Sequence, residues 1–571
     1  MTFLTSRTEE AAAAFKRAQI CVSSARTDEA ENLCRAALEL DHEQADALKL
    51  LIMILSERGA DLEVEKLLSQ YLVSHPKHGP SLQGLGQLKA RQGDDESAVD
   101  YFHRAAESLP SHAPLFNDLG VSLYRLGRPV EAIDSFDRAL QLEPGHDLAH
   151  SNRGMALLDC KKYDEAMHAL LMALINTGPA PNEERASILQ NLVKSAYRAG
   201  KLALIEPVLR EEAKNDASAG AAEQLAFLLD LSERHEEAKA VRNQRARRIG
   251  LSWSRAKNSK ATVLILGGVG GNHVPTRYLI DPKTFSSFSL SLLSADEPNA
   301  PLGFVDFNVL RRADVVFNAL GDADIDEGQL AAVRDVCQKL GKPLLNPPEA
   351  ILQTGRENAP KLFKDIPSMI VPMAHRTTRD ELAARCVDAP VLVRPIGDHG
   401  GERLMLLRDD QEKTAYVSRR GAEQILLTPF YDFRSADEHW RKYRLIFVDR
   451  HVYAYHLAIG DDWLVHYWRA GMARAEWKKR EEEEFLTDWR AVFGPAAASA
   501  VEAAARRLNL DYCGMDCALM RDGRVLLFEA NACMLLHLNE PVAAFPYKHR
   551  YVPKIRDAFS ELVLARAGNR N

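Results

Sequence analysis

The chain lacks several features that would assign it to common classes of protein. Its 571 residues carry a net charge of −7, so the basic excess typical of nucleic-acid-binding proteins is missing. It contains no run of 18 apolar residues, and we therefore expect no membrane-spanning helix. The first residues lack the basic and then apolar pattern of a secretory signal, which favours a cytoplasmic protein. None of the eight cysteines forms a C-x-x-C pair, so neither a zinc ribbon nor a disulfide framework is expected.

Tryptophan is absent before Trp253, and in that first part alanine and leucine recur at helical spacing. Pro76, Pro110 and Pro144 lie 34 residues apart. Glycine and phenylalanine repeat at the same period, at Gly86 and Gly120 and at Phe102 and Phe136. Glycine allows two helices to approach closely, phenylalanine fills the contact, and proline ends each helical unit. A 34-residue period of these residue types resembles the tetratricopeptide repeat, a pair of helices that stacks into a solenoid.

The repeat resemblance covers residues 11–178, with about five good repeats and one or two degenerate ones, and residues 181–248 also have a helical pattern. We therefore expect an all-α domain over residues 1–250. Such solenoids present a concave groove, which predicts a peptide or protein partner. A rigid spacer or a dimerisation surface is the alternative for the same pattern.

The second half of the chain has the pattern of an α/β protein. Short apolar strands are expected at 261–266, 314–318 and 343–346, with a helix at 329–340, and this alternation predicts a parallel sheet in a domain over 261–350. The glycines at 267–271 lack the spacing of a dinucleotide site, because His273 stands where glycine is needed. They predict a tight turn beside a substrate pocket. No G-x-x-x-x-G-K-[ST] motif is present, so a P-loop enzyme is not expected.

A hairpin near the C-terminus has the most specific pattern. Two apolar runs flank Asp522 and Gly523, a dipeptide typical of two-residue hairpin turns. Counting outward from that turn places Leu519 opposite Leu526 and Asp516 opposite Glu529. Asn531 shares the face of Glu529 because side chains alternate along a strand. Two carboxylates and an amide oxygen suit Mg²⁺, with phosphate oxygens completing its shell. The alternative is an exposed polar face with two chance acids, but the face around Asp516 is expected to be apolar.

Residues 350–535 resemble an ATP-grasp ligase of the glutathione-synthetase or RimK-like type, on Asp516, Glu529 and Asn531. The resemblance implies two Mg²⁺ ions that bridge the phosphates of ATP, and an ATP-grasp domain of two subdomains over 351–565 with the nucleotide between them. It implies that Lys361 and Arg394 hold phosphates, although the family usually has lysine at the position of Arg394. It also implies that Arg444 meets the γ-phosphate and the acyl-phosphate.

The resemblance further implies a nucleotide pocket built from loops and a strand end. A glycine-rich loop over the phosphates is expected to contribute Gly397, His399, Gly400 and Gly401. The adenine is expected at the strand end that holds Leu427 and Phe430. Asp432 would accept from the ribose hydroxyls, although a loop-capping role fits it equally well. ATP is therefore the expected nucleotide.

Residues 456–472 are dense in His, Asp, Trp and Arg, and we expect a loop over the acceptor side of the pocket. Its candidate substrate residues are Asp462, His466 and Arg469. The charge run at 474–484 is expected to be a solvated helix face. ATP-grasp ligases activate a carboxylate as an acyl-phosphate, which an amine or a thiol then attacks, so unknown acid and amine substrates are implied. Two alternatives are an adaptor that only senses nucleotide and a kinase on the same fold.

Overall fold

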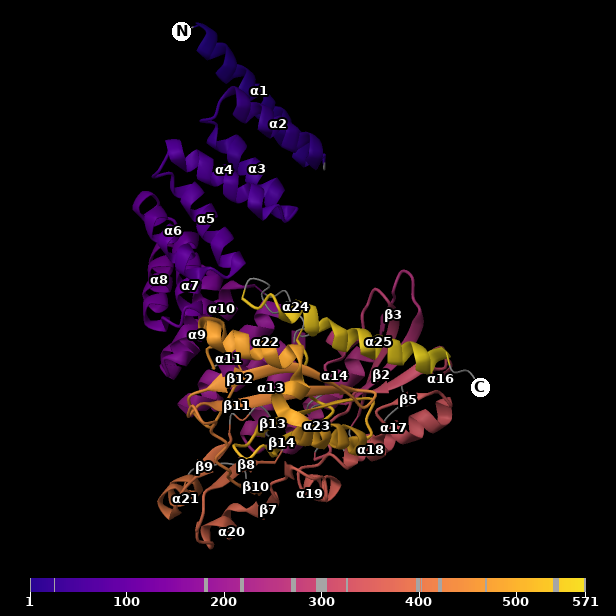
Figure 1. Cartoon of the computed structure of the whole chain (residues 1–571). Coiled ribbons are helices and arrows are strands. Elements are labelled where there is room, and N and C mark those ends of the chain that lie inside the picture. Colours follow the sequence, from indigo (N-terminus) through magenta and orange to yellow (C-terminus); the bar gives the residue numbers. More distant parts are fainter. Residues whose placement is uncertain are drawn as a thin grey trace. The chain divides into compact units, whose positions relative to one another are not determined.

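Figure 1 presents the computed structural model of the chain, which divides into two compact units, Met1–Ile205 and Glu206–Asn571. The described residues are 2–24, 26–178, 183–215, 220–268, 274–293, 306–324, 327–396, 401, 403–418, 424–467, 470–537 and 544–568. The division falls within one helix, so the helices that follow it belong to the second unit and not, as the sequence predicts, to a single domain over residues 1–250. No helix in these described ranges is long and apolar enough to cross a membrane.

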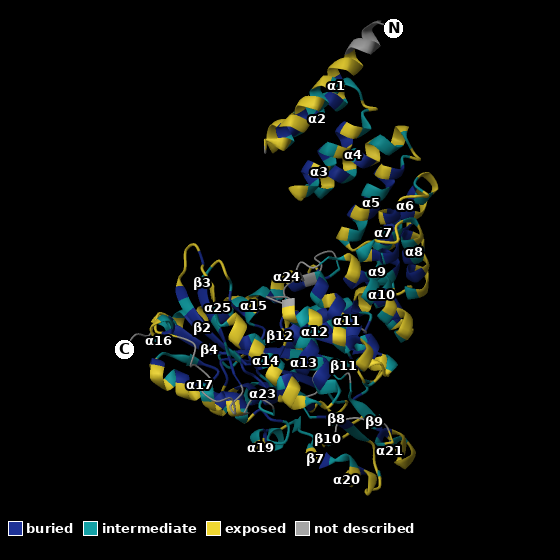
Figure 2. Ribbon diagram, turned by 180° about the vertical axis from the view of Figure 1, so that it is seen from behind, coloured by how far each residue is buried: buried dark blue, intermediate teal, exposed yellow. Residues whose placement is uncertain are grey.

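The first unit is entirely helical, as the repeat pattern predicts, and successive helices pack as pairs. The helices are α1 (Thr2–Ser23), α2 (Thr27–Leu40), α3 (Ala45–Glu57), α4 (Asp61–Ser74), α5 (Gly79–Gln92), α6 (Asp95–Ser108), α7 (Ala113–Arg125), α8 (Pro129–Leu142), α9 (Asp147–Asp159), α10 (Tyr163–Asn176) and α11 (Glu183–Ala199). Figure 2 shows buried residues along the contacts between paired helices and exposed residues on their outer faces. Pro76, Pro110 and Pro144 all lie in the turns between pairs, which confirms their expected role.

Glycine and phenylalanine set the distance between the paired helices. A Cβ atom at Gly86 would lie 2.5 Å from the Phe102 ring, and one at Gly120 would lie 2.5 Å from the Phe136 ring. Only a residue without a side chain fits against a buried ring at that distance. The close approach that the 34-residue period predicts is therefore confirmed in both repeats.

The second unit begins with helices and then forms a parallel sheet. Its helices are α12 (Leu202–Asn215, across the division), α13 (Ala221–Leu231) and α14 (His235–Ile249). The sheet has the order β1-β3-β2-β4-β5, with β1 (Leu251–Ser254), β2 (Ala261–Gly268), β3 (Phe285–Leu292), β4 (Val315–Asn318) and β5 (Leu344–Leu345). All neighbours are parallel except β1, which runs antiparallel at the edge. The accompanying helices are α15 (Thr276–Leu279), α16 (Phe307–Leu310), α17 (Glu327–Leu340), α18 (Pro348–Leu352) and α19 (Ala359–Leu362). The predicted parallel sheet is confirmed.

A small antiparallel sheet follows, with its own core. Its order is β7-β10-β8-β9, with β7 (His375–Thr378), β8 (Val391–Pro395), β9 (Met405–Leu407) and β10 (Gln424–Pro429). Two short helices belong to it, α20 (Arg379–Ala383) and α21 (Asp410–Val417). Its buried side chains, including Leu382, Val393 and Ile425, form a cluster apart from the main core of the unit.

A third sheet carries the predicted metal hairpin. Its order is β12-β11-β13-β14-β6, with β6 (Met369–Ile370), β11 (Trp440–Val448), β12 (His451–Gly460), β13 (Tyr512–Leu519) and β14 (Val525–Asn531). The remaining helices are η2 (Met472–Arg474), α22 (Glu476–Thr487), α23 (Trp489–Leu508), α24 (Lys548–Tyr551) and α25 (Pro553–Gly568). One hydrophobic core joins this sheet to the parallel sheet.

Two expectations for this region are wrong. Residues 456–460, predicted as the start of a loop, complete strand β12. The charge run at 474–484 is not a solvated face, because Lys478 and Glu482 of α22 are buried. Lys478 donates to the carbonyl oxygens of Ile459 and Ala470, at 2.8 and 2.9 Å, and Glu482 pairs with Lys548 at 3.0 Å.

Candidate functional site

Four polar residues form a row across the third sheet. His456 on β12 lies opposite Arg444 on β11, Arg444 lies opposite Asp516 on β13, and Asp516 lies opposite Glu529 on β14. Residues directly opposite one another share a face of the sheet, with Cβ atoms about 4.5–5.5 Å apart. The row therefore brings an arginine, a histidine and two carboxylates together on one face.

The pairing of Asp516 with Glu529 is confirmed, but the register nearer the turn is wrong by one residue. Leu519 lies opposite Val525, not Leu526. The turn is longer than predicted because Gly523 has φ +81° and its N–H donates to the carbonyl oxygen of Met520, the pattern of a three-residue loop closed by a glycine bulge. A second irregularity between Asp516 and the next residue restores the predicted pair.

The second irregularity also moves the apolar residues of β14 between faces. Leu527 lies opposite Cys517 and so faces away from Asp516. A hairpin without irregularities would instead place it on the same face as Asp516. Cys513 and Cys517, at odd spacing from Asp516, are fully buried, as their alternation predicts.

Asp516 is held by two cations of the chain. The guanidinium of Arg444 donates to both carboxylate oxygens, at 2.6 and 2.8 Å, and Lys442 Nζ lies 3.3 Å from one of them. Asp516 is 6% exposed, and burial acts to raise its pKa. The charges of Arg444 and Lys442 outweigh burial, so the pKa of Asp516 is lowered from its ordinary value. Asp516 is therefore a carboxylate at neutral pH.

Glu529 is held by an arginine that is not among the predicted site residues. Arg356 lies in the segment between α18 and α19, with Nη2 3.5 Å from Glu529 and Nη1 3.3 Å from Asp324. Lys361, the residue expected to reach the phosphates from this segment, is exposed in the four-residue helix α19. No sequence signal near Arg356 marks it, because Glu529 is far away along the chain. Lys442 could have been found, since it lies two residues before Arg444 and so shares its face.

The predicted metal ligands are adjacent. Asn531 donates from its amide nitrogen to Glu529, and its oxygen accepts from the N–H of Cys533 at 2.9 Å. An amide oxygen has a second lone pair, and each carboxylate oxygen accepts more than one contact, so the three side chains fit a hard cation. No group of three His, Cys, Asp or Glu that could hold a metal occurs within the described ranges. Phosphate oxygens or water would therefore have to complete the shell.

Three of the residues predicted to bind ATP lie on the small antiparallel sheet or directly after it. Arg394 on β8 lies opposite Leu426 on β10, and Leu427 is the next residue of that strand. The N–H of Phe430, just after β10, donates to the carbonyl oxygen of Pro390 at 3.0 Å. Asp432 pairs with Arg434 at 2.6 Å, which is a contact within its own loop. Gly401 has φ +73°, while Gly397, His399 and Gly400 lie outside the described residues. Their roles in nucleotide binding stay predictions.

The predicted substrate residues follow β12. Asp462 is exposed and accepts from the N–H of Trp463 at 2.6 Å, a contact within the turn. His466 is half-buried, and its ring nitrogen Nδ1 is buried. Arg469 lies outside the described residues.

The first unit has a groove of about 380 Å³ between α3 and α5. The lining residues combine two cations with apolar side chains: Lys49, Ile52, Met53, Ser56, Val64, Gly84, Gln87 and Arg91. Met53 is 45% exposed, which gives the groove an accessible apolar wall. Arg91 pairs with Asp61 at 3.0 Å, and both side chains are partly exposed. A surface ion pair of this kind contributes little stability, so Arg91 could exchange it for an acidic group of a partner.

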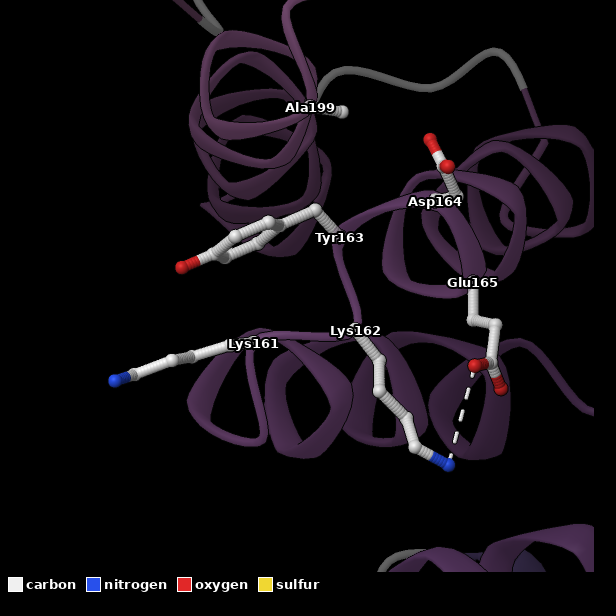
Figure 3. A pocket seen from close by; sticks show the side chains of 6 residues that line it. All are labelled: Lys161, Lys162, Tyr163, Asp164, Glu165 and Ala199. Carbon is white, nitrogen blue, oxygen red and sulfur yellow. Dashed lines mark ion pairs between the residues drawn. The ribbon is translucent and has the colours of Figure 1, made fainter.

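Figure 3 shows a second hollow, of about 280 Å³, at the turn between α9 and α10 and the end of α11. Charged side chains dominate it, and Lys162 pairs with Glu165 at 3.9 Å. None of the residues predicted to bind nucleotide, metal or substrate lies in it, so we assign it no role.

Comparison with known proteins identifies the repeats. The family model of the tetratricopeptide repeat matches residues 83–147 and 117–183. No curated protein sequence matches the chain closely enough to count as a relative. The structure of PilF from Pseudomonas aeruginosa is 20% identical over 41% of this chain and 99% of that chain, with a TM-score of 0.32. YrrB, described as a TPR protein with an unusual peptide-binding site, is 21% identical over 28% of this chain and 84% of that chain, with a TM-score of 0.26. The N-terminal region of this protein is thus all helical and contains tetratricopeptide repeats within residues 83–183, and a mixed α/β region follows it.

Proposed function

We propose that the second unit is an ATP-dependent ligase that joins a carboxylate to an amine or a thiol, on a peptide or protein held by the repeats. The observation that carries the proposal is the row of Arg444, Asp516 and Glu529 on one face, with Asn531 beside it. The row supports phosphoryl transfer because its two carboxylates could bind a metal ion while the arginine beside them could bind phosphate oxygens. The resemblance to ATP-grasp ligases supplies the reaction type.

The metal ligands would be Asp516, Glu529 and Asn531. A bound Mg²⁺ supplies charge neutralisation at the β- and γ-phosphates of ATP. The chain's own cations have separate tasks. A guanidinium has five N–H groups, so the pair that Arg444 makes with Asp516 leaves donors for a phosphoryl oxygen. Lys361 and Arg394 are expected at the phosphates, and Arg356 is a further candidate because it is already at Glu529.

The proposed reaction has two steps. A carboxylate oxygen of the acid substrate attacks the γ-phosphorus of ATP, and the bond to ADP breaks to give an acyl-phosphate. The amine nitrogen then attacks the acyl carbon, the C–N bond forms, the bond from carbon to the phosphate oxygen breaks, and the amine proton passes to solvent. The products are an amide, ADP and phosphate. Positioning and charge stabilisation contribute most of the acceleration in phosphoryl transfer, which is what a rigid sheet face can provide.

The repeats suggest a protein-interaction role, and the groove between α3 and α5 supports it. Its apolar wall and the two cations Lys49 and Arg91 would suit a segment that carries apolar and acidic side chains. Such a partner would either be the substrate or carry it. An adaptor that senses nucleotide is the second candidate, favoured by the fact that the repeats are the part whose family is identified.

The test is release of phosphate from Mg-ATP in the presence of pools of acids and amines, with Glu529→Gln as the variant. Loss of a ligand charge from a phosphate clamp should reduce turnover by about 10²-fold or more. The control is Glu502→Gln on α23, where the acid pairs with Arg490 at the surface. A ligase gives ADP and free phosphate, whereas a kinase gives ADP and a phosphoester. If the protein is an adaptor, the wild type forms neither set of products faster than Glu529→Gln does. Equal turnover by Glu529→Gln and the wild type would refute the metal assignment.

A further inference from the structure

His456 is the one member of the four-residue row to which the proposed reaction gives no task. It lies directly opposite Arg444 and is 6% exposed. Its Nε2 atom is buried, and no hydrogen-bond partner for it exists among the described residues. A buried polar atom without a partner costs about 1–3 kcal/mol, and such atoms in folded proteins call for an explanation. The cost is explained if a ligand supplies the missing partner.

The ring of His456 is fixed by aromatic neighbours. Its centroid lies 4.9 Å from that of Tyr455 and 4.7 Å from that of Tyr467, with which it stacks at 28°. Tyr467 is itself held by Lys548, whose Nζ lies 4.1 Å from the ring centroid and donates to the Tyr467 hydroxyl. Lys548 in turn pairs with Glu482 at 3.0 Å in the protein interior. The imidazole therefore has a defined orientation, and its ring neighbours offer it mainly apolar surface.

The surroundings of His456 keep it neutral and favour an anion beside it. Burial lowers the pKa of His456, and the nearby charges of Arg444, Lys548 and Lys442 lower it further. The carboxylates of Asp516 and Glu482 are already paired with cations. A neutral imidazole carries one N–H, and histidines with a lowered pKa serve other enzymes as neutral hydrogen-bond donors to a developing oxyanion.

We propose that Nε2–H of His456 donates a hydrogen bond to an oxygen of the acid substrate, in its carboxylate and acyl-phosphate forms, next to Arg444. The inference rests on the proposed ligase function and assigns the Arg444–His456 end of the row to the acid, with Asp516 and Glu529 at the nucleotide end. The bond involves no proton transfer.

The experiment measures binding of acetyl phosphate to the full-length protein by calorimetry in the presence of Mg²⁺ and ADP. His456→Phe keeps a ring to stack on Tyr467 but has no donor, and should bind acetyl phosphate about ten- to a hundredfold more weakly. His456→Gln, whose amide nitrogen reaches about as far as Nε2, should recover most of the affinity, whereas the shorter His456→Asn should not. His451→Phe, at the exposed start of the same strand, is the matched control. The dissociation constant for ATP should stay the same in all four variants.

Binding of acetyl phosphate by His456→Phe as tightly as by the wild type overturns the inference, as does a wild type that does not bind it. If His456→Phe fails to fold, the difference between His456→Gln and His456→Asn decides the question, and equal affinities overturn the inference. Failure of the proposed function has a separate signature: the wild type binds acetyl phosphate and shows the predicted pattern of variants, yet releases no phosphate from Mg-ATP with any acid and amine.

Discussion

Replacing Gly321 by alanine should displace the strand end that carries the predicted metal ligands. Gly321 lies in the loop after β4 and is buried. A Cβ atom there would lie 2.6 Å from Cys533 Sγ, 3.1 Å from the Cys533 nitrogen and 3.3 Å from the carbonyl carbon of Ala532. The same Cys533 N–H donates to Asn531. Movement of this backbone would therefore reach the site directly.

The cost can be worked out from those contacts. Non-bonded heavy atoms sit best at about 3.5–4.0 Å, so all three contacts are too short. The sulfur can rotate away, but the two backbone atoms can move only with the strand. Added atoms in a packed core typically cost about 1–3 kcal/mol, and we expect about 2 kcal/mol here because backbone must shift. Removing the sulfur with Cys533→Ala in the Gly321→Ala background should recover only part of that loss.

The assay is urea unfolding followed by tryptophan fluorescence. All six tryptophans lie after residue 250, so in the full-length protein the signal reports on the second unit alone. Gly321→Ala should lower the urea midpoint without changing the slope, and it should also lower phosphate release. Gly267→Ala is the control, since a Cβ atom there has no neighbour within 4 Å. Equal midpoints for Gly321→Ala and Gly267→Ala would show that the close approach has no energetic consequence.

Two further predictions concern charge. Arg356→Ala removes the arginine contact of Glu529 and should weaken ATP turnover by tenfold or more, with Lys361→Ala as the comparison. A larger loss for Lys361→Ala in steady-state phosphate release would return the phosphate role to the lysine. In the folded protein the pKa of His456 lies well below its ordinary value of 6.5. As the pH drops below 6.5, His456 therefore takes up a proton in the unfolded chain but not in the folded protein, and the free energy of unfolding falls. His456→Phe should reduce the dependence of the free energy of unfolding on pH by up to about 1.4 kcal/mol per pH unit, measured by the same fluorescence assay between pH 6.5 and 5. An unchanged pH dependence would mean that His456 titrates normally.

The repeats show how far local sequence can determine a structure. The 34-residue period, the glycines at Gly86 and Gly120 and the rings opposite them predict both the helix pairs and their close approach, and all of these are confirmed. The reason is that each repeat contacts mainly its neighbours in the sequence. In the parallel sheet, short apolar patterns marked the strands β2, β4 and β5 and the helix α17. The strands β1 and β3 were not predicted, because the serine-rich sequence of β3 lacks a continuous apolar run.

The metal hairpin is an intermediate case. The sequence identified the turn and the facing of Asp516 and Glu529, but it missed the longer loop at Gly523 and the irregularity beside Asp516. The two errors cancel, since each shifts the register by one residue in opposite directions. Nothing in the local pattern marks such irregularities, because they depend on how the strand fits the rest of the sheet.

The electrostatic partners were decided by tertiary structure alone. The charge run of α22 has the composition of a solvated face, yet Glu482 is buried because Lys548, Tyr467 and Tyr547 reach it from other elements. Arg356 meets Glu529 only when the segment before α19 packs beside β14. Sequence alone therefore determined the helix pairs of the repeats and the facing of Asp516 and Glu529. Which charges are buried and paired was decided by the folded chain, because a charge enters the interior only where distant residues supply its partner.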